Sequence, residues 1–476
     1  MAAEDNWDAA WVFVKYRLDG GDWRHATLDP GRYHVPPDAV VDVPAEGKGA
    51  FVYRASPGYG TFSARGVTLP WKADTDGVTD DATLDVSAFA VEMVFVPQGP
   101  FALGSGGSRP GEFRAGGAPR APFFVEGPSP IGLGDSPGNL FWDTPLGQQA
   151  DMPTASTRAS FPSGYEAYYV MKYQVTQGQY VDFLNTLRQS QADARLPTVS
   201  GSRYAITGAA VGSYTTSLPF VAMPWLSWAD GAAYADWAGL RPMTELEFEK
   251  LARGPVAPIA HEYAWGSFSI TPATGLQGAG TPQEVLEPAN ANATYDLHLS
   301  EPGPARAGAF AAPGRSRRDA GAGYYGALEL SGNLWERVVT VANAEGRAFS
   351  GLHGDGQLHA LGGATVPGWP GSSAIGAGFR GGSWDSQLAL LRVSDRSRAA
   401  HVDSQRSDDH GFRAARTAPS PHVTATPGVT LPEPGVDSDH AAAVVVTITP
   451  PHADLTSNAS RTFTATVTGT SDTRLR

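Results

Sequence analysis

The stretch Gly378–Arg416 reads GFRGGSWDSQLALLRVSDRSRAAHVDSQRSDDHGFRAAR, and it is the most informative part of the chain. The same tripeptide, GFR, brackets it at Gly378–Arg380 and Gly411–Arg413. Between the brackets, arginines recur at regular intervals, and the leucines follow neither a strand period nor a helix period. This pattern predicts a fixed scaffold that carries freely chosen surface side chains.

Further motifs precede this stretch. They are Met93–Ser105 (MVFVPQGPFALGS), Tyr168–Asn185 (YYVMKYQVTQGQYVDFLN), Met223–Gly254 (MPWLSWADGAAYADWAGLRPMTELEFEKLARG), Tyr263–Gly266 (YAWG), Glu329–Arg337 (ELSGNLWER) and Arg380–Trp384 (RGGSW). In this order, over Val91–Arg416, they resemble the formylglycine-generating enzyme family, also called the sulfatase-modifying factor family. The resemblance implies an α+β domain with a C-type-lectin-like fold and long irregular stretches.

The resemblance also implies an oxidase whose copper is bound by two cysteines that follow the RGGSW motif. Aligned on that motif, those positions hold Ser386 and Leu391, and the whole chain has no cysteine. A serine hydroxyl is hardly ionised at neutral pH and is a poor ligand for a soft metal. We therefore expect this fold without copper and without enzymatic activity.

The segment 384–410, here called the variable segment, more closely resembles the variable proteins of diversity-generating retroelements. In those proteins, mutagenic reverse transcription replaces adenines, so that Asn codons scatter to Asp, Ser and His or, by double changes, to Leu, Val, Ala, Gly and Arg. Residues 380–416 contain no Asn. This is the outcome expected from a diversified Asn-rich template. The alternative is a Ser- and Asp-rich surface loop of an ordinary pseudoenzyme.

From this resemblance we expect a non-enzymatic protein that recognises a receptor through the variable segment. Solvent-facing Trp384, Leu388, Leu390 and His401 would supply apolar and aromatic contacts. Asp and Ser side chains would supply adaptable hydrogen bonds, as in antibody loops. The expected ligand-binding residues are Trp384, Asp385, Ser386, Leu388, Leu390, Asp395, Ser397, His401, Asp403, Ser404, Ser407, Asp408, Asp409 and His410.

The regularly placed arginines have a different expected role. Each guanidinium offers five donors and can bind backbone carbonyls and carboxylates, which would fix an irregular chain. The arginines in question are Arg392, Arg396, Arg398, Arg406 and Arg413. Ser, His and Asp also occur together in this region, but a catalytic triad needs a fixed geometry that a diversified surface does not supply. We therefore predict no catalytic residues.

The motif ELSGNLWE resembles a calcium loop of the family. Carried over by position, Glu329 and Glu336 would give carboxylates, and Gly332 and Leu334 would give carbonyl oxygens. Hard oxygen donors of this kind suit a structural Ca²⁺. The alternative is a structural turn in which Asn333 and Glu336 bind the backbone.

Four parts are expected along the chain. Residues 1–90 read as a small β-sandwich, and residues 91–416 as the α+β domain. Residues 417–440 are rich in proline and predict a linker. Residues 441–476 contain two strand patterns and resemble part of a bacterial Ig-like domain. Within the α+β domain, Thr176, Ser227 and Thr244 predict the starts of three helices.

Composition limits the partners. The chain has 476 residues and a formal net charge of −13, which disfavours nucleic acid and anionic membranes. No apolar stretch long enough for a transmembrane helix is present, and the first residues, MAAEDNWDAA, show no signal peptide. We expect a protein or glycan ligand on a cell or virus surface, with the chain itself on a phage particle or a bacterial cell surface.

Two rival functions remain open. One is an enzyme of the same superfamily that lacks the copper cysteines, such as an iron-dependent oxygenase. Such an enzyme would need a cluster of three histidines, and we find no HxxxHxE-like helix in the sequence. The other rival is a purely structural pseudoenzyme, for example a spacer in a phage tail or an adhesin.

Overall fold

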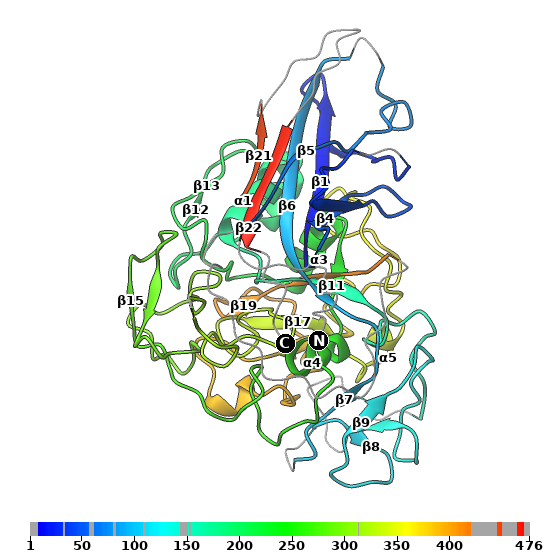
Figure 1. Cartoon of the computed structure of the whole chain (residues 1–476), viewed down its shortest axis with the longest axis vertical. Helices are drawn as coiled ribbons and strands as arrows, with labels where there is room; N and C mark the ends of the chain where they lie inside the picture. The colour runs from blue at the N-terminus through cyan, green and yellow to red at the C-terminus, as the bar shows by residue number, and fades with distance from the viewer. Residues whose placement is uncertain are drawn as a thin grey trace.

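The computed structural model describes residues 8–31, 34–56, 61–79, 82–107, 111–142, 151, 154–312, 314–419, 445–449 and 464–470. Within these residues the chain is a mixed α+β protein with far more strand and loop than helix (Figure 1). The predicted fold class, α+β, is thereby confirmed. Most of the predicted linker, from residue 420 onward, lies outside the described residues.

An antiparallel eight-stranded sheet forms the centre of the molecule. Across the sheet the strands are β14 (Arg241–Pro242), β20 (Ala414–Thr417), β11 (Tyr168–Met171), β6 (Leu84–Val96), β1 (Ala9–Leu18), β4 (Ala50–Arg54) and β3 (Ala39–Asp42), and β2 (Arg24–His25) pairs with β1. Strand β6 pairs with β1 from Leu84 to Met93 and with β11 from Met93 to Val96. The boundary expected at residue 90 therefore falls inside a strand. Strands β1 to β4 therefore extend the sheet of the following domain, whereas β5 (Thr61–Val67) lies in a second sheet and shares one hydrophobic core with β1, β3 and β4.

A second, smaller sheet lies beside the N-terminal strands. It joins β5 (Thr61–Val67) to β22 (Thr464–Thr470), which in turn pairs with β21 (Val445–Thr449). Figure 1 shows the red C-terminal strands next to the blue N-terminal ones. The two strands expected near the end of the chain are therefore present. They pair with each other, and β22 also pairs with β5, which lies about 400 residues earlier in the chain.

Three helices begin where the sequence predicted. They are α1 (Gln177–Asn185), α3 (Trp228–Trp237) and α4 (Glu245–Arg253), and each has a capping box made by Thr176, Ser227 or Thr244. In such a box the cap side chain and the side chain three residues later satisfy two backbone N–H groups. Shorter helices are α2 (Gln189–Arg195), α5 (Ala344–Arg347) and the 3₁₀ helix η1 (Leu388–Leu391).

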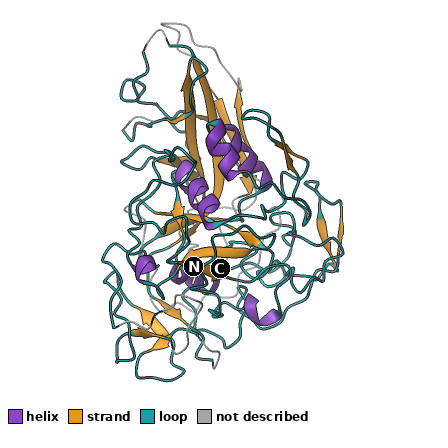
Figure 2. Ribbon diagram, turned by 180° about the vertical axis from the view of Figure 1, so that it is seen from behind, coloured by secondary structure: helices purple, strands orange, loops and turns teal. Residues whose placement is uncertain are grey.

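The helices cover the central sheet and bury most of its aromatic side chains. One core joins Trp11, Phe51 and Tyr169 of the sheet to Phe183 of α1 and Trp237 of α3. Figure 2 shows these helices lying across the strands. A second core joins α4 to the opposite face of β6 and β11.

The long stretches without a clear period contain only short strands. These are β7 (Phe101–Leu103), β8 (Arg114–Ala115), β9 (Phe123–Val125), β10 (Leu140–Phe141), β12 (Ile206–Thr207), β13 (Thr215–Thr216), β15 (Gly275–Gln277) and β16 (Val285–Glu287). They form isolated two-stranded ribbons. The remaining three-stranded sheet, which holds the candidate site, consists of β18 (Ala377–Arg380), β17 (Trp335–Val339) and β19 (His410–Gly411).

Candidate functional site

The variable segment is a long loop, and the strands at its two ends both pair with the same neighbouring strand, β17. Strand β18, just before it, pairs antiparallel with β17, and β19, at its end, pairs in parallel with the other edge of β17. Glu336 of β17 lies opposite both Arg380 and Gly411. The loop therefore starts and ends at fixed positions only two strand widths apart.

Buried arginines hold the middle of this loop. Arg396 binds both carboxylate oxygens of Glu245, with Nε 2.8 Å from Oε2 and Nη2 3.0 Å from Oε1. Its Nη1 donates to the Gly111 carbonyl at 2.9 Å, and its guanidinium lies 3.6 Å from the centre of the Phe113 ring. Arg380 binds the same Glu245 at 3.1 Å and Glu249 at 2.6 Å. These buried cations keep the pKa of Glu245 low against the effect of its burial.

Arg406 and Arg413 fix the end of the loop. Arg406 binds both oxygens of Asp230, at 2.7 and 2.9 Å. Arg413 is fully buried and donates to Glu336 Oε1 at 2.9 Å and to the carbonyls of Met171 and Lys172 at 2.9 and 2.7 Å. The scaffold role predicted for these two arginines and for Arg396 is confirmed.

Arg392 and Arg398 differ from the prediction. Arg398 is exposed, and its guanidinium lies over the Trp335 ring at 5.1 Å. Arg392 is half-buried, with Nη1 3.2 Å from His261 Nδ1. Both lie at the surface, so their side chains belong to the exposed side of the loop.

Much of the variable segment faces solvent, as expected. Leu388, at the start of η1, is 41% exposed. The expected ligand-binding residues that are exposed are Asp385, Leu388, Ser397 and Ser404, and those that are half-buried are Leu390, His401, Asp403, Ser407 and Asp408. These nine positions are here called the exposed set.

The remaining members of the predicted site are buried, which corrects the prediction for them. Trp384 is only 6% exposed and packs with Ala222 and Leu334, while its Nε1 donates to the Asp408 carbonyl at 3.2 Å. Its amide also donates to the Asn333 carbonyl at 2.8 Å. Trp384 therefore joins the two ends of the loop and is a scaffold residue.

Polar partners explain the burial of Ser386, Asp395 and His410, whereas Asp409 Oδ1 is buried without a hydrogen-bond partner among the described residues. Ser386 bonds to Ser383, with the two hydroxyl oxygens 2.6 Å apart, and Asp395 accepts from the Ser397 hydroxyl at 2.6 Å. His410 Nδ1 lies 2.9 Å from Arg337 Nη2, and burial, followed by Arg337, lowers the pKa of this imidazole to about 2. Burial raises the pKa of Asp409 above its usual value. A sequence pattern cannot distinguish a solvated Ser or Asp from one that is satisfied inside a loop.

The two positions that would carry the copper ligands, Ser386 and Leu391, both have structural roles. Ser386 belongs to the hydroxyl pair with Ser383, and Leu391 is fully buried in the core beneath α4. Neither side chain supplies a thiolate. Among the described residues, no group of three or more His, Asp or Glu side chains is placed to hold a metal ion.

The predicted calcium residues do lie together, beside Arg413. Glu329 Oε1 accepts the Gly308 amide at 2.8 Å and Glu336 Oε1 accepts Arg413, but Glu329 Oε2 and Glu336 Oε2 are buried without a hydrogen-bond partner among the described residues. Burial raises the pKa of Glu329 to about 7, and neighbouring Glu336 adds to the shift. Two close carboxylates with free oxygens fit a hard cation.

The backbone positions predicted for the calcium loop lie in the same segment. The Leu334 carbonyl accepts a hydrogen bond from Gln174 at 2.7 Å and has a second lone pair that could bind a cation. Gly332 is at φ 94° in the same loop.

Sequence reasoning missed two neighbours of the exposed set. The turn around Asp296 and Leu297 donates its amides to the carbonyls of Ser386 and Trp384, at 3.1 and 3.0 Å, and it leaves Leu297 59% exposed. Ser202 donates to Asp408 at 2.6 Å. Both belong to long irregular stretches, and the two residues of the turn have positive φ values. Nothing in the local sequence places them beside the variable segment.

Two comparisons relate the chain to known proteins. A family model described as the sulfatase-modifying factor enzyme 1-like domain matches residues 84–418. A protein of Streptomyces coelicolor named formylglycine-generating enzyme is 33% identical over 196 residues, which are 40% of this chain and 52% of that protein. The chain therefore spans about half the length of this curated relative. Separately, no helix among the described residues is long and apolar enough to cross a membrane.

Proposed function

The chain belongs to the sulfatase-modifying factor enzyme 1-like domain family, and we propose that it is a non-enzymatic receptor-recognition member of that family. Its binding face would be the exposed set, diversified by a retroelement and carried on a C-type-lectin-like variant of the family fold. The ligand would be a protein or glycan on a cell or virus surface. The chain itself would act on a phage particle or a bacterial cell surface.

One observation supports this proposal above the others. In and just after the variable segment, buried Arg396 and Arg413 and half-buried Arg406 bind Glu245, Glu336 and Asp230, while the side chains between them include the exposed set. Contact chemistry can change at the exposed positions without disturbing these ion pairs. That separation is what a recognition surface of variable sequence requires.

The exposed set also has the composition of a contact surface. Leu388 and Leu297 present apolar area. Asp385 and Asp408 are acidic and lie close enough to Asp409 to add to the rise in its pKa that burial causes. Apolar area would supply affinity, and the acidic side chains would select a partner of complementary charge.

The enzyme alternative draws on the relative's name, formylglycine-generating enzyme. Against it, Ser386 and Leu391 lack the chemistry of a copper thiolate site. We expect no formylglycine when the protein is incubated with copper(I), oxygen and a cysteine-containing sulfatase peptide, with the Streptomyces enzyme as positive control. Metal analysis and oxygen uptake would test an iron-dependent oxygenase in the same samples. Turnover in either assay would overturn the non-enzymatic proposal.

Recognition is tested directly by binding to candidate cells. Labelled protein is incubated with bacteria, and binding is compared with a variant carrying Asp385→Ala, Leu388→Ala, Ser397→Ala and Ser404→Ala. A control variant, Phe268→Ala with Leu361→Ala, removes exposed apolar side chains elsewhere. We expect the first variant to lose binding and the control to retain it. Equal binding by both variants would contradict the proposed face. Protease and periodate treatment of the cells would separate a protein ligand from a glycan.

A further inference from the structure

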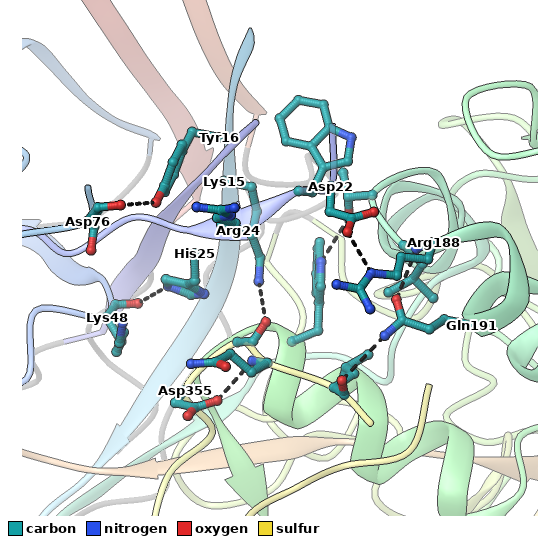
Figure 3. A pocket seen from close by; sticks show the side chains of 17 residues that line it. Lys15, Tyr16, Asp22, Arg24, His25, Lys48, Asp76, Arg188, Gln191 and Asp355 are labelled. Atoms are coloured by element: carbon teal, nitrogen blue, oxygen red, sulfur yellow. Dashed lines mark hydrogen bonds and ion pairs between the residues drawn. The ribbon is translucent and has the colours of Figure 1, made fainter. Parts of the chain in front are cut away.

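A cavity of about 370 Å³ lies far from the variable segment in the chain, where the N-terminal strands meet the helices (Figure 3). Its walls come from β1 and β2, from the junction of α1 and α2, from the end of α3 and from the loop at residues 355–358. The volume falls at the lower end of the range of about 300–1,000 Å³ that is typical of ligand sites, and such sites favour junctions of this kind. A fitting occupant is therefore small.

Lys15 is the deepest cation in this cavity. Its side chain comes from the middle of β1, and the residue is only 2% exposed. Its ammonium has one hydrogen bond among the described residues, a long one of 3.4 Å to the Gly356 carbonyl, and it lies 5.2 Å from the centre of the Trp237 ring. An ammonium has three N–H donors, so Lys15 can still donate to a further, stronger hydrogen-bond acceptor.

The acidic side chains that line the cavity are already engaged. Asp76 accepts the Thr27 amide at 2.7 Å and also binds the Trp71 indole. Asp22 pairs with Arg188 at 2.8 Å, and Asp355 accepts the Gln357 amide at 2.9 Å.

The cations of the cavity are less satisfied than its acids. Lys48 reaches only the Thr27 hydroxyl, at 3.3 Å, and Arg24 adds a further exposed guanidinium. Burial lowers the pKa of Lys15 to about 7; Asp236 and Asp355 oppose this shift, and Lys48 adds to it. At the floor of the cavity, the Lys15 ammonium lies next to the Trp237 ring with one long hydrogen bond among the described residues.

We propose that this cavity is a second binding site, which takes a small organic carboxylate whose anionic group binds Lys15. The carboxylate would replace the weak bond to Gly356 and give the buried ammonium a charged partner. Such charge-assisted hydrogen bonds are the strong ones in a partly dry site. The body of the ligand would lie against Trp237 and Tyr16, which line the walls. The site uses no residue of the variable segment.

Isothermal titration calorimetry on the full chain tests this proposal. The probes are acetate, benzoate and D-glucuronate, each paired with a neutral counterpart: acetamide, benzamide and D-glucose. We expect at least one carboxylate to bind at least about tenfold more tightly than its neutral counterpart, which corresponds to about 1.4 kcal/mol. Lys15→Met should remove that preference, and Lys72→Met, which changes a lysine outside the cavity, should leave it intact.

A second variant, at a less buried lysine, keeps the test valid if Lys15→Met fails to fold. Lys48→Met lies at the edge of the cavity and should weaken carboxylate binding by roughly two- to fivefold, the effect of a partly exposed charge. If no carboxylate is preferred over its neutral counterpart, or if the preference survives in Lys15→Met, the proposal is wrong. Loss of cell binding through the exposed set would not change either outcome.

Discussion

At the scale of single residues, Arg396 and Arg398 make the clearest contrast in the molecule. They lie two positions apart, yet Arg396 is buried and forms an ion pair with Glu245, whereas Arg398 is exposed. Removing Arg396 leaves the buried Glu245 carboxylate with Arg380 as its remaining cationic partner, and losing one partner of a buried ion pair is strongly destabilising. We expect Arg396→Met to lower the free energy of unfolding by about 3 kcal/mol, and Arg398→Met to change it by less than about 0.5 kcal/mol. Urea unfolding of both variants measures this difference, and equal losses would contradict the scaffold role.

Lys15 gives a prediction on pH. Its pKa is about 7 in the folded protein, below its ordinary value of 10.5, so between these values the unfolded chain binds more protons. The free energy of unfolding should therefore rise with pH in that window, by about 2 kcal/mol between pH 7 and pH 9. Lys15→Met should lose this contribution and keep only the rise from Lys250, whose pKa burial also lowers to about 7. Denaturation of both proteins at the two pH values checks the difference, and parallel pH profiles would contradict it.

Some residue roles could be predicted from the sequence and others could not. Thr176, Ser227 and Thr244 cap helices as predicted, because a capping box is a local pattern. The interior position of Trp384 and His410 depends on Leu334 and Arg337, which lie many residues earlier in the chain. No local signal carries that information.

At the scale of elements, the variable segment should tolerate substitution at its exposed side chains but not at its buried ones. A variant with Asp385→Ala, Leu388→Ala and Ser404→Ala, which spares the Ser397 hydroxyl on buried Asp395, should lose less than about 1 kcal/mol of unfolding free energy, since exposed positions contribute little. Trp384→Ala, within the same loop, should lose about 3 kcal/mol because it opens a cavity. Thermal unfolding of both variants gives the comparison. A large loss in the first variant would show that the exposed set belongs to the core.

The loop that carries Glu329 and Glu336 gives the metal prediction. If it binds Ca²⁺, the ion stabilises the native state by mass action, by about 2.7 kcal/mol at a hundredfold excess over Kd. A chelator should then lower the melting temperature of the wild type but not that of Glu329→Gln. Glu345→Gln, which changes an exposed carboxylate on α5, should behave like the wild type. An unchanged melting temperature on chelation of the wild type would remove the calcium site.

Strand β6 runs across the boundary expected at residue 90. The sequence has turn residues before Leu84 and a family motif that starts at Met93, which together suggest two units. The structure makes one strand of Leu84–Val96, paired with β1 and β11 in turn. Strand patterns show that a segment is extended but not which strands lie beside it, so a shared strand cannot be seen in advance.

At the scale of the whole molecule, the ion-paired body of the fold and the exposed set are distinct parts of the described structure. The central sheet, its helices and the ion pairs of Glu245, Asp230 and Glu336 form the body. The exposed set lies outside it. This separation allows recognition to vary while the fold stays constant, which is the central claim of the proposed function.

The most direct test of that claim is to sequence this gene across a population of its carriers, together with the DNA on either side of it. We expect a reverse transcriptase gene and a near-identical template repeat nearby, with substitutions confined to adenines of the template. The protein changes should concentrate at the exposed set and spare Arg396, Arg406 and Arg413. Substitutions spread evenly over the domain, or no template repeat beside the gene, would contradict the account.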